Sequence, residues 1–450
     1  MAPTESTDPA SQPAATPRPQ PAAPAVDQGP DAPAASRGSL LRHRDFRLLW
    51  AGDSVSVFGM QLVGFALPLV AIRVLGADEF QMGLLGALEM LAFLLIGLPA
   101  GAWVDRWRKK RVIVLGDLTR AVLLLTVPAA FLGGWLGMWQ LYVVIFLTGC
   151  VTVFFDVANQ SYLPALVESE QISEGNSRLQ ATQQVAIVAG PALAGPLVRL
   201  LGSPVVIAIT AVCMGLSSLF VSRIEHQEPE PDPTTRRPLR AEIREGLSFV
   251  LGQPLLRRIV LCTGTTNFAS SGIGALFMLF ALTTLGLDEI TLGVVLAVSG
   301  GAGLLGALTA GRFGRLVGEG RAIPLAAVIG GLAVFSVPLA AVLPTLPTLF
   351  VGWSLVTWSV VVYNIGQVSF RQRLCPKPLL GRMNASIRFL VWGPMPVGAL
   401  VGGVVAREIG MLTTFWIFCA IALLATVPVV FSPLARMREL PRELEALSES

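Results

Sequence analysis

The chain has 450 residues, of which 53% are hydrophobic and only 14% are charged. A soluble domain carries about 25% charged residues, so the composition excludes an ordinary soluble protein and indicates a membrane protein. The net charge is +4, but the basic residues lie between apolar blocks, where they orient a chain in a bilayer, so we expect no nucleic-acid partner. The five cysteines form no Cys-x-x-Cys pair, and the sequence has no Ser/His/Asp set and no glycine-rich phosphate loop. We therefore expect no enzyme activity, no metal and no cofactor.

The first 37 residues hold nine prolines, many alanines and little else. No basic stretch precedes an apolar core there, so the segment is not a cleavable signal. Its composition predicts a disordered tail over 1–37.

Twelve apolar blocks follow, and each is long enough to cross a bilayer, which takes about 20 residues. They are 49–74, 80–104, 112–133, 137–161, 178–201, 203–222, 256–284, 288–311, 322–342, 346–369, 383–406 and 411–432. Backbone groups in lipid must be satisfied internally, and no block shows the two-residue alternation of a barrel strand. The blocks predict an all-α membrane protein with 12 transmembrane helices.

The basic residues alternate between the two ends of these helices. One set of ends carries Arg42, Arg44, Arg47, Arg106, Arg108, Lys109, Lys110, Arg111, Arg312, Arg315, Arg321, Arg371, Arg373, Lys377, Arg382, Arg436, Arg438 and Arg442, together with the seven arginines from Arg223 to Arg258. The other set carries only Arg73, Arg199 and Arg407. The positive-inside rule therefore predicts a multi-pass protein of the inner (plasma) membrane with both termini in the cytoplasm.

The longest connection, 223–255, opens with the spacer EPEPDPTTRRP and continues as LRAEIREGLSFVL. In a helix, one face would carry Leu239, Ile243, Leu247 and Val250, opposite Arg240 and Arg244. This pattern predicts either an amphipathic helix on the inner leaflet or an ordinary solvated helix.

The connection separates two sets of six helices that share a weak internal repeat. At an offset of 208, Asn176 meets Asn384, Gly190 meets Gly398 and Gly195 meets Gly403, and Gly101 falls near Gly306 at an offset of 205. Such parallel repeats are typical of transporters. We expect a tail over 1–37, six-helix bundles over 38–222 and 256–432, a cytoplasmic linker over 223–255 and a cytoplasmic tail over 433–450.

The segment GAWVDRWRKKR, residues 101–111, resembles the signature between helices 2 and 3 of the major facilitator superfamily. The resemblance implies that fold and a cytoplasmic gate made of Gly101, Asp105, Arg106, Arg108 and Lys109. Gly101 would allow close helix approach, and Asp105 would meet the positive N-terminal end of helix 11. The contacts would latch the halves in the outward-open state. The alternative is a positive-inside stop signal with no role in switching.

A second motif, AGPALAG in helix 5, is similar to the Gly-Pro motif of antiporters in that superfamily. Its residues are Gly190, Pro191 and Gly195. Proline lacks a backbone donor and kinks a helix, whereas the glycines leave a smooth face for packing. The motif favours antiport, although structural packing alone would also explain it.

The stretches RDFRLLWAG, GLPAGAWVDR, VFFDVANQSYLPALV, GPALAGP and EIREGLSFVL resemble the branch that contains macrolide-efflux proteins and the enterobactin exporter. The resemblance covers almost the whole chain and implies export driven by the proton gradient. Two features depart from it: Met60 stands where that branch commonly has an acid in helix 1, and helix 4 lacks the arginine of drug antiporters.

Charged residues inside spans cost about 2.5–3.5 kcal/mol on insertion scales, so each requires a reason. Glu89, the deepest acid, is the first candidate for proton coupling, and a protonated packing glutamate is the alternative. Asp117 and Arg120 lie three residues apart and are expected to pair, either as a structural element or as partners of the loop motif. Together with Asp53 and Asp156 they are further candidates for proton coupling. Asp53 and Asp156 lie near the inner ends of helices 1 and 4 and are candidate gate residues, although solvation at the interface would explain them equally well.

In this superfamily helices 1, 4, 7 and 10 line the cavity. The resemblance therefore assigns to it Gln61, Phe65, Thr148, Asn267, Phe268, Trp358, Tyr363 and Asn364. Aromatic walls with a few amides suit a bulky amphipathic solute. We expect a monomeric, lipid-embedded transporter that exports a hydrophobic or amphipathic small molecule (drug, macrolide or siderophore-like) in exchange for protons. The alternatives are a proton-independent exporter, an uptake carrier, or a sensor or scaffold that transports nothing.

Overall fold

The structure is a computed structural model that describes residues 40–104, 106–168, 171–226, 228, 239–375 and 380–438. The chain divides into two units, Met1–Ser39 and Leu40–Ser450, and only the second contains described residues. The predicted tail 1–37, the gate residue Asp105, the spacer 229–238 and the last twelve residues, 439–450, lie outside the described residues.

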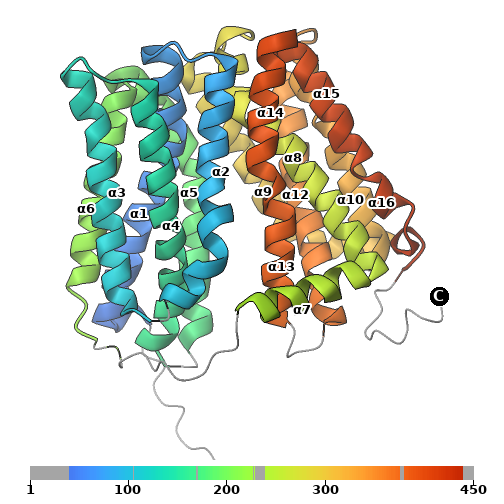
Figure 1. Ribbon diagram of the computed structural model, residues 1–450, viewed down its shortest axis with the longest axis horizontal. Helices are drawn as coiled ribbons and strands as arrows, with labels where there is room; N and C mark the ends of the chain where they lie inside the picture. The colour runs from blue at the N-terminus through green and yellow to red at the C-terminus, as the bar shows by residue number, and fades with distance from the viewer. Residues whose placement is uncertain are drawn as a thin grey trace, which may run out of the picture. The chain divides into compact units, whose positions relative to one another are not determined.

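The first half of the second unit consists of long helices joined by short turns (Figure 1). A 3-10 turn over Leu40–Arg42 precedes α1, and a π-helical turn over Val70–Val74 extends it. The helices are α1 (Arg44–Leu69), α2 (Glu79–Val104), α3 (Lys109–Leu132), α4 (Met138–Leu166), α5 (Ile172–Leu201) and α6 (Ser203–Ser222).

The second half has the same plan with more interruptions. Its elements are α7 (Leu239–Gly252), α8 (Pro254–Thr283), α9 (Glu289–Val317), α10 (Glu319–Ala333), α11 (Ser336–Leu339), α12 (Thr345–Leu374), α13 (Leu380–Trp392), α14 (Pro394–Ile409), α15 (Met411–Leu424), α16 (Val427–Val430) and a 3-10 turn over Pro433–Ala435.

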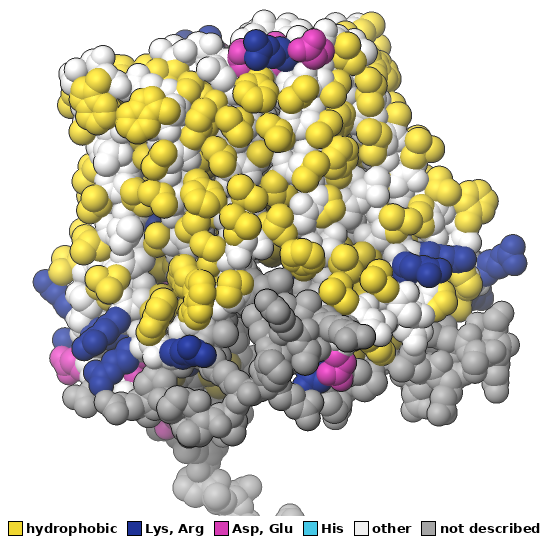
Figure 2. Space-filling view, in the orientation of Figure 1, with side chains coloured by type: hydrophobic (Ala, Val, Ile, Leu, Met, Phe, Trp, Pro, Cys, Tyr) yellow, Lys and Arg dark blue, Asp and Glu magenta, His cyan; other side chains and the backbone are white. Residues whose placement is uncertain are grey.

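Within the described residues, twelve helical segments are long and apolar enough to cross a membrane. The predicted all-α membrane fold is therefore confirmed. Figure 2 shows hydrophobic side chains over most of the visible face, with lysine and arginine gathered along its lower edge. On α3, for example, Leu118, Val122, Leu125 and Leu132 are exposed. Such a surface would aggregate in water, so it faces lipid.

The helices of each half pack mainly on one another. In the first half α1 packs on α5 and α6, and α3 packs on α4 and α6. In the second half α8 packs on α14 and α15, and α12 packs on α9 and α10. Two helix pairs make the main contacts between the halves: α5 packs on α9, and α2 packs on α14, while α2 also touches α8 and α13. The bundle limits 38–222 and 256–432 remain predictions.

Both helix pairs that join the halves depend on glycine. A methyl group added to Gly83 of α2 would lie 2.6 Å from the Cα atom of Gly403 in α14. A methyl group added to Gly293 of α9 would lie 2.5 Å from the carbonyl oxygen of Pro191 and 3.4 Å from the Cα atom of Gly195 in α5. Only glycine allows the backbones to approach this closely. We call the end of the bundle where these contacts lie the closed end, and the opposite end, which carries Arg42–Arg47 and Lys109–Arg111, the basic end.

The helices that correspond to each other in the repeat, α5 in the first half and α13 with α14 in the second, differ at their prolines. α5 is one continuous helix through Pro191 and Pro196. Its counterpart in the second half ends at Trp392 and restarts at Pro394 after a turn at Gly393. Pro394 and Pro396 lack backbone donors within the first turn of α14, where helix geometry tolerates them.

Helix α7 lies across the basic end of the second half in Figure 1. It packs on α13 and α8, and Val250 is fully buried against Leu255 and Leu256. Arg382 of α13 also donates to the Glu245 carboxylate of α7 at 2.6 Å. The helix is therefore docked on the bundle along one face.

Candidate functional site

A cavity of about 740 Å³ lies where the two halves meet. Most of its wall comes from α1, α2 and α4, and α8 supplies most of the wall on the side of the second half. Arg120 and Leu124 of α3 also line it, and single side chains from α5 and α14, Gln183 and Met395, complete the wall. The cavity has the volume of a drug-sized binding site.

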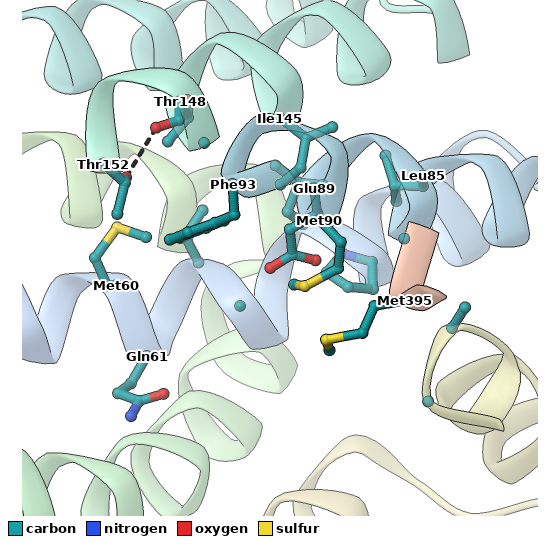
Figure 3. Close-up of a pocket in the computed structure, with 18 of the residues that line it drawn as sticks. Met60, Gln61, Leu85, Glu89, Met90, Phe93, Ile145, Thr148, Thr152 and Met395 are labelled. Atoms are coloured by element: carbon teal, nitrogen blue, oxygen red, sulfur yellow. Dashed lines mark hydrogen bonds between the residues drawn. The ribbon is translucent and has the colours of Figure 1, made fainter. Parts of the chain in front are cut away.

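Glu89 of α2 belongs to this wall, and its carboxylate points into the cavity (Figure 3). It lies ten residues after the start of α2 at Glu79, which is about 15 Å along the helix and so near the middle of a bilayer core of about 30 Å. Gly149 of α4 allows the close approach of α2 at this level, because an added methyl group would lie 2.9 Å from Ala92. Glu89 is thus an acid at mid-membrane depth in an open space between the halves.

Methionine is the commonest apolar residue of the wall. Five of the eleven methionines of the chain line the cavity: Met60, Met82, Met90, Met278 and Met395. Figure 3 shows the thioethers of Met90 and Met395 directed into the same space as Glu89. Methionine is flexible and polarisable, so such a wall adapts to ligands of different shape. Sequence reasoning missed these residues, because a methionine facing a cavity has the same hydropathy as one facing lipid.

At the first-half side of the cavity, Asp117 and Arg120 form a buried ion pair. Ser217 of α6 donates to Asp117 Oδ2 at 2.6 Å, and Ser56 of α1 donates to Asp117 Oδ1 at 3.2 Å. The Arg120 guanidinium also lies 4.0 Å from the centre of the Phe155 ring. The expected pairing is present in the structure, and it ties α1, α3, α4 and α6 together.

Two further aspartates lie close to this pair. Asp53 is buried and accepts a hydrogen bond from Asn159 Nδ2 at 2.6 Å. Asp156 is exposed to the cavity and lines its wall. Both are within electrostatic range of Arg120. Three carboxylates therefore share one guanidinium, so the cluster contains more acidic groups than basic groups.

The cavity residues predicted on the first, fourth and seventh spans, which are α1, α4 and α8, divide into two groups. Gln61, Thr148 and Asn267 line the cavity. Phe65 is instead buried in the core, and Phe268 stacks on Phe418 with ring centres 5.6 Å apart.

The predicted residues of α12 lie elsewhere in the second half. Trp358 donates to Thr309 Oγ1 at 2.9 Å and packs edge-to-face on Phe313. Tyr363 and Asn364 line a second, smaller chamber of about 90 Å³, whose wall is formed by residues of α8, α10, α12 and α15. Asn267 and Ser270 belong to the walls of both spaces, so the chamber adjoins the main cavity.

The gate motif lies at the basic end. Gly101 is in the last turns of α2, Arg106 and Arg108 are exposed in the turn that follows, and Asp105 lies outside the described residues. The Lys109 ammonium donates to the Ser161 carbonyl at 3.2 Å, within the first half. The Glu228 carboxylate accepts hydrogen bonds from the backbone N–H groups of Lys109 and Lys110 at 2.6 and 2.7 Å. An acid from the linker thus caps the positive N-terminal end of α3.

Two ion pairs join the halves at the closed end. Arg73 donates to Glu289 at 3.0 Å, and Arg199 donates to Asp288 at 2.7 Å. Hydrogen bonds from the Thr291 side chain and backbone, reinforced by Arg199, hold the pKa of Asp288 below its ordinary value. The helix-5 motif lies beside these pairs, because Gly190 packs against Gln61 of α1 and Gly195 packs against Glu289 of α9.

A comparison with known protein families decides the identity. Residues 49–394, well over half of the chain, match the family described as Major Facilitator Superfamily. The chain belongs to this superfamily. It is a multi-pass membrane transporter, and the predicted family resemblance is confirmed.

The transporter is similar over nearly its whole length to three exporters. It is 22% identical to macrolide efflux protein A of Streptococcus pyogenes over 88% of this chain and 97% of the relative. It is 28% identical to the multidrug efflux pump Tap of Mycolicibacterium fortuitum over 85% of this chain and 93% of the relative. It is 25% identical to the enterobactin exporter EntS of Salmonella typhimurium over 84% and 88%.

Solved structures agree with the fold at low identity. An inward-facing structure of a bacterial homologue of the iron transporter ferroportin aligns with a TM-score of 0.71 at 17% identity, covering 87% of the transporter and 98% of that chain. An outward-facing structure of such a homologue aligns with a TM-score of 0.54 at 16% identity, covering 86% and 98%. The arrangement of helices in the transporter is therefore closer to the first structure.

Proposed function

We propose that the transporter exports an amphipathic small molecule from the cytoplasm by alternating access, in exchange for protons. The observation that carries the proposal is the large methionine-lined cavity between the halves, with one acid, Glu89, at mid-membrane depth. An adaptable apolar wall accepts bulky ligands of varied shape. The names of the relatives, which are macrolide, multidrug and enterobactin exporters, support the same class of substrate and the same direction of transport.

The basic end faces the cytoplasm in this proposal, with both chain termini on that side of the plasma membrane. Arg106, Lys109 and the other basic residues of this end support the assignment through the positive-inside rule. Helix α7 then rests at the inner leaflet. The glycine contacts and ion pairs of the closed end seal the outer side, and the greater likeness to an inward-facing structure agrees with a cavity open toward the cytoplasm.

Proton coupling rests on Glu89 in this account. The carboxylate faces a space that both solute and water reach, so the loss or gain of its proton can be linked to solute binding. The cluster of Asp53, Asp117, Asp156 and Arg120 is a second place for a proton, because its three acids share one arginine. Each proton that crosses contributes about 2.3 kcal/mol per 100 mV.

The gate motif acts in the other conformation of the transport cycle, in which the cytoplasmic side is closed. When the cytoplasmic side closes, Gly101 and Asp105 meet the second half, and Arg106, Arg108 and Lys109 strengthen the contact. In the present conformation Lys109 binds within its own half, which is what an unlatched gate requires. The 38–222 and 256–432 bundles would rock as units, and the transporter would act as a monomer in lipid.

The test begins with resistance of a pump-deficient bacterial host to a panel of macrolides, lipophilic dyes and catecholate siderophores. An exported compound is then followed in proteoliposomes under an imposed pH gradient. We expect the wild type to use the pH gradient to move the compound against the concentration gradient of the compound itself. Glu89→Gln should lower this pH-driven flux at least tenfold while still binding the solute. Glu408→Gln, at an exposed glutamate of the closed end, is the matched control.

Unchanged pH-driven flux in Glu89→Gln would end the assignment of Glu89. A wild type that moves the solute at the same rate with and without the gradient would show a proton-independent carrier. A wild type that moves no compound of the panel would favour a sensor or scaffold.

A further inference from the structure

The chamber inside the second half is not explained by the proposed function. It has a volume of about 90 Å³, which is room for about three water molecules at roughly 30 Å³ each. α8, α10, α12 and α15 all contribute to its wall, so it lies within the second half and away from the main seam between the halves.

The wall of the chamber is uncharged and combines apolar residues with several hydroxyl and amide groups. The residues that line it are Cys262, Thr263, Thr266, Asn267, Ser270, Ala326, Ala327, Gly330, Gly331, Val334, Val356, Ser359, Val360, Tyr363, Asn364 and Ala422. The Thr263 hydroxyl and the Tyr363 hydroxyl are hydrogen-bonded to each other at 2.8 Å. A charged group placed here would lose its hydration without gaining a counter-charge, so the wall selects a neutral ligand.

Two asparagines of the wall retain hydrogen-bonding capacity. The Asn267 amide nitrogen donates to the Val391 carbonyl at 2.7 Å, which leaves its oxygen as an acceptor. The Asn364 oxygen accepts from Gln367 at 3.2 Å, which leaves its amide nitrogen as a donor. A hydroxyl or amide group both donates and accepts, so it matches this pair.

The chamber also has a direct relation to the main cavity, because Asn267 and Ser270 line both spaces. A ligand held between Glu89 and the methionines can therefore extend one arm between these two residues. A structural water site would need no such shared wall.

We infer that the chamber is a second binding subsite, which receives a short neutral arm bearing a hydroxyl or amide group from the transported molecule. The inference rests on the proposed function, because it assumes that the main cavity holds the body of that molecule. It makes the second half the part of the transporter that distinguishes substrates by their hydrogen-bonding substituents.

The probes for the test are two dyes with one aromatic body, one carrying an N-ethyl arm and the other an N-(2-hydroxyethyl) arm. Their export is measured in a pump-deficient host and their binding is measured on the purified full-length transporter. We expect the wild type to bind the hydroxyethyl dye more tightly. Thr266→Val, which removes one hydroxyl from the wall, should lower this preference about threefold to tenfold.

Ala327→Met fills the chamber from α10 and should remove the preference altogether, with tenfold weaker binding of the hydroxyethyl dye. Ala420→Met is the matched control, since Ala420 is exposed on α15, and it should leave both dyes unchanged. Equal melting temperatures of the wild type and the two methionine variants exclude misfolding as the cause.

A preference that survives both Ala327→Met and Thr266→Val would overturn the subsite and leave a chamber that holds water only, while export of the dyes would still support the proposed function. Absence of export and binding of both dyes by the wild type would overturn both proposals together.

Discussion

The interiors of the two halves differ in charge although their helices follow one plan. The first half buries Asp53, Asp117 and Arg120, and it presents Glu89 and Asp156 to the cavity. Every fully buried polar side chain described in the second half is neutral, from Ser299 to Ser432. A repeated fold has thus been adapted to two kinds of chemistry: charge and proton exchange in the first half, and neutral hydrogen bonding in the second.

The difference in buried charge between the halves should have its largest effect on the free energy of unfolding. Asp117→Asn removes the one carboxylate that is in direct contact with the buried Arg120 guanidinium, and breaking a buried ion pair in this way costs about 3–5 kcal/mol. Ser359→Ala is the control in the second half, where the buried hydroxyl donates to the Leu355 carbonyl at 2.6 Å, and it should cost no more than about 1 kcal/mol. Thermal unfolding of both variants in detergent measures the contrast. Equal shifts would show that the buried charge has no special structural role.

A second experiment compares the glycine contacts with an open position on the same helix. Gly83→Ala places a methyl group against Gly403, whereas Gly97 of α2 has nothing within 4 Å of an added methyl group. Overpacking costs about 1–3 kcal/mol, so Gly83→Ala should shift the population toward opening of the closed end by about fivefold to a hundredfold. Gly97→Ala should shift nothing.

Labelling of a cysteine placed at Met278, a cavity residue of α8, by an impermeant maleimide measures this opening from outside the cell. Faster labelling in Gly83→Ala alone is the expected result. Equal rates in the two alanine variants would mean that the contact does not control access.

The smallest effect is expected at the ion pairs of the closed end. Arg199 and Asp288 are 57% and 42% exposed, and exposed pairs contribute about 0.2–1 kcal/mol. Arg199→Gln should therefore shift the same labelling rate by less than about fivefold. Glu408→Gln, at an exposed position of the same end, is the control and should leave the labelling rate unchanged.

The pH dependence of this pair has a definite sign. Because the pKa of Asp288 is lowered from its ordinary value of 3.8, its contribution is fully present above that value and is lost as the pH falls through the lower pKa of the folded state. The Arg199→Gln effect should thus be constant from pH 5 to pH 8. An effect that disappears within this range would contradict the pairing.

The sequence was sufficient for the twelve spans because hydropathy reports which segments enter lipid. The predicted spans were too short at the basic end: α5 begins at Ile172, whereas the predicted span begins at 178. Those residues are helical but lie beyond the apolar core, and hydropathy does not detect polar helix outside the bilayer.

The candidate site was less accessible from the sequence. The acids were found because an intramembrane charge requires a reason, and Asp117 and Arg120 do lie in contact. The position of Tyr363 in a separate chamber depends on the rotation of α12 about its axis, and an evenly apolar helix gives no signal for it. The ion pairs at the closed end join residues 89 or more positions apart, so only the packing of the halves reveals them.

The central claim is that the two halves move against each other, so that the closed end opens when the basic end closes. Leu132 at the end of α3 and Val342 before α12 are 85% and 74% exposed and lie at the closed end of the first and second half. Spin labels at these positions, after replacement of the five native cysteines, report the distance between the halves in lipid nanodiscs. We predict two distance populations whose ratio changes with pH and with an exported solute, and a loss of the pH response in Glu89→Gln. A single distance, unchanged by pH, by solute and by Gly83→Ala, would contradict the account.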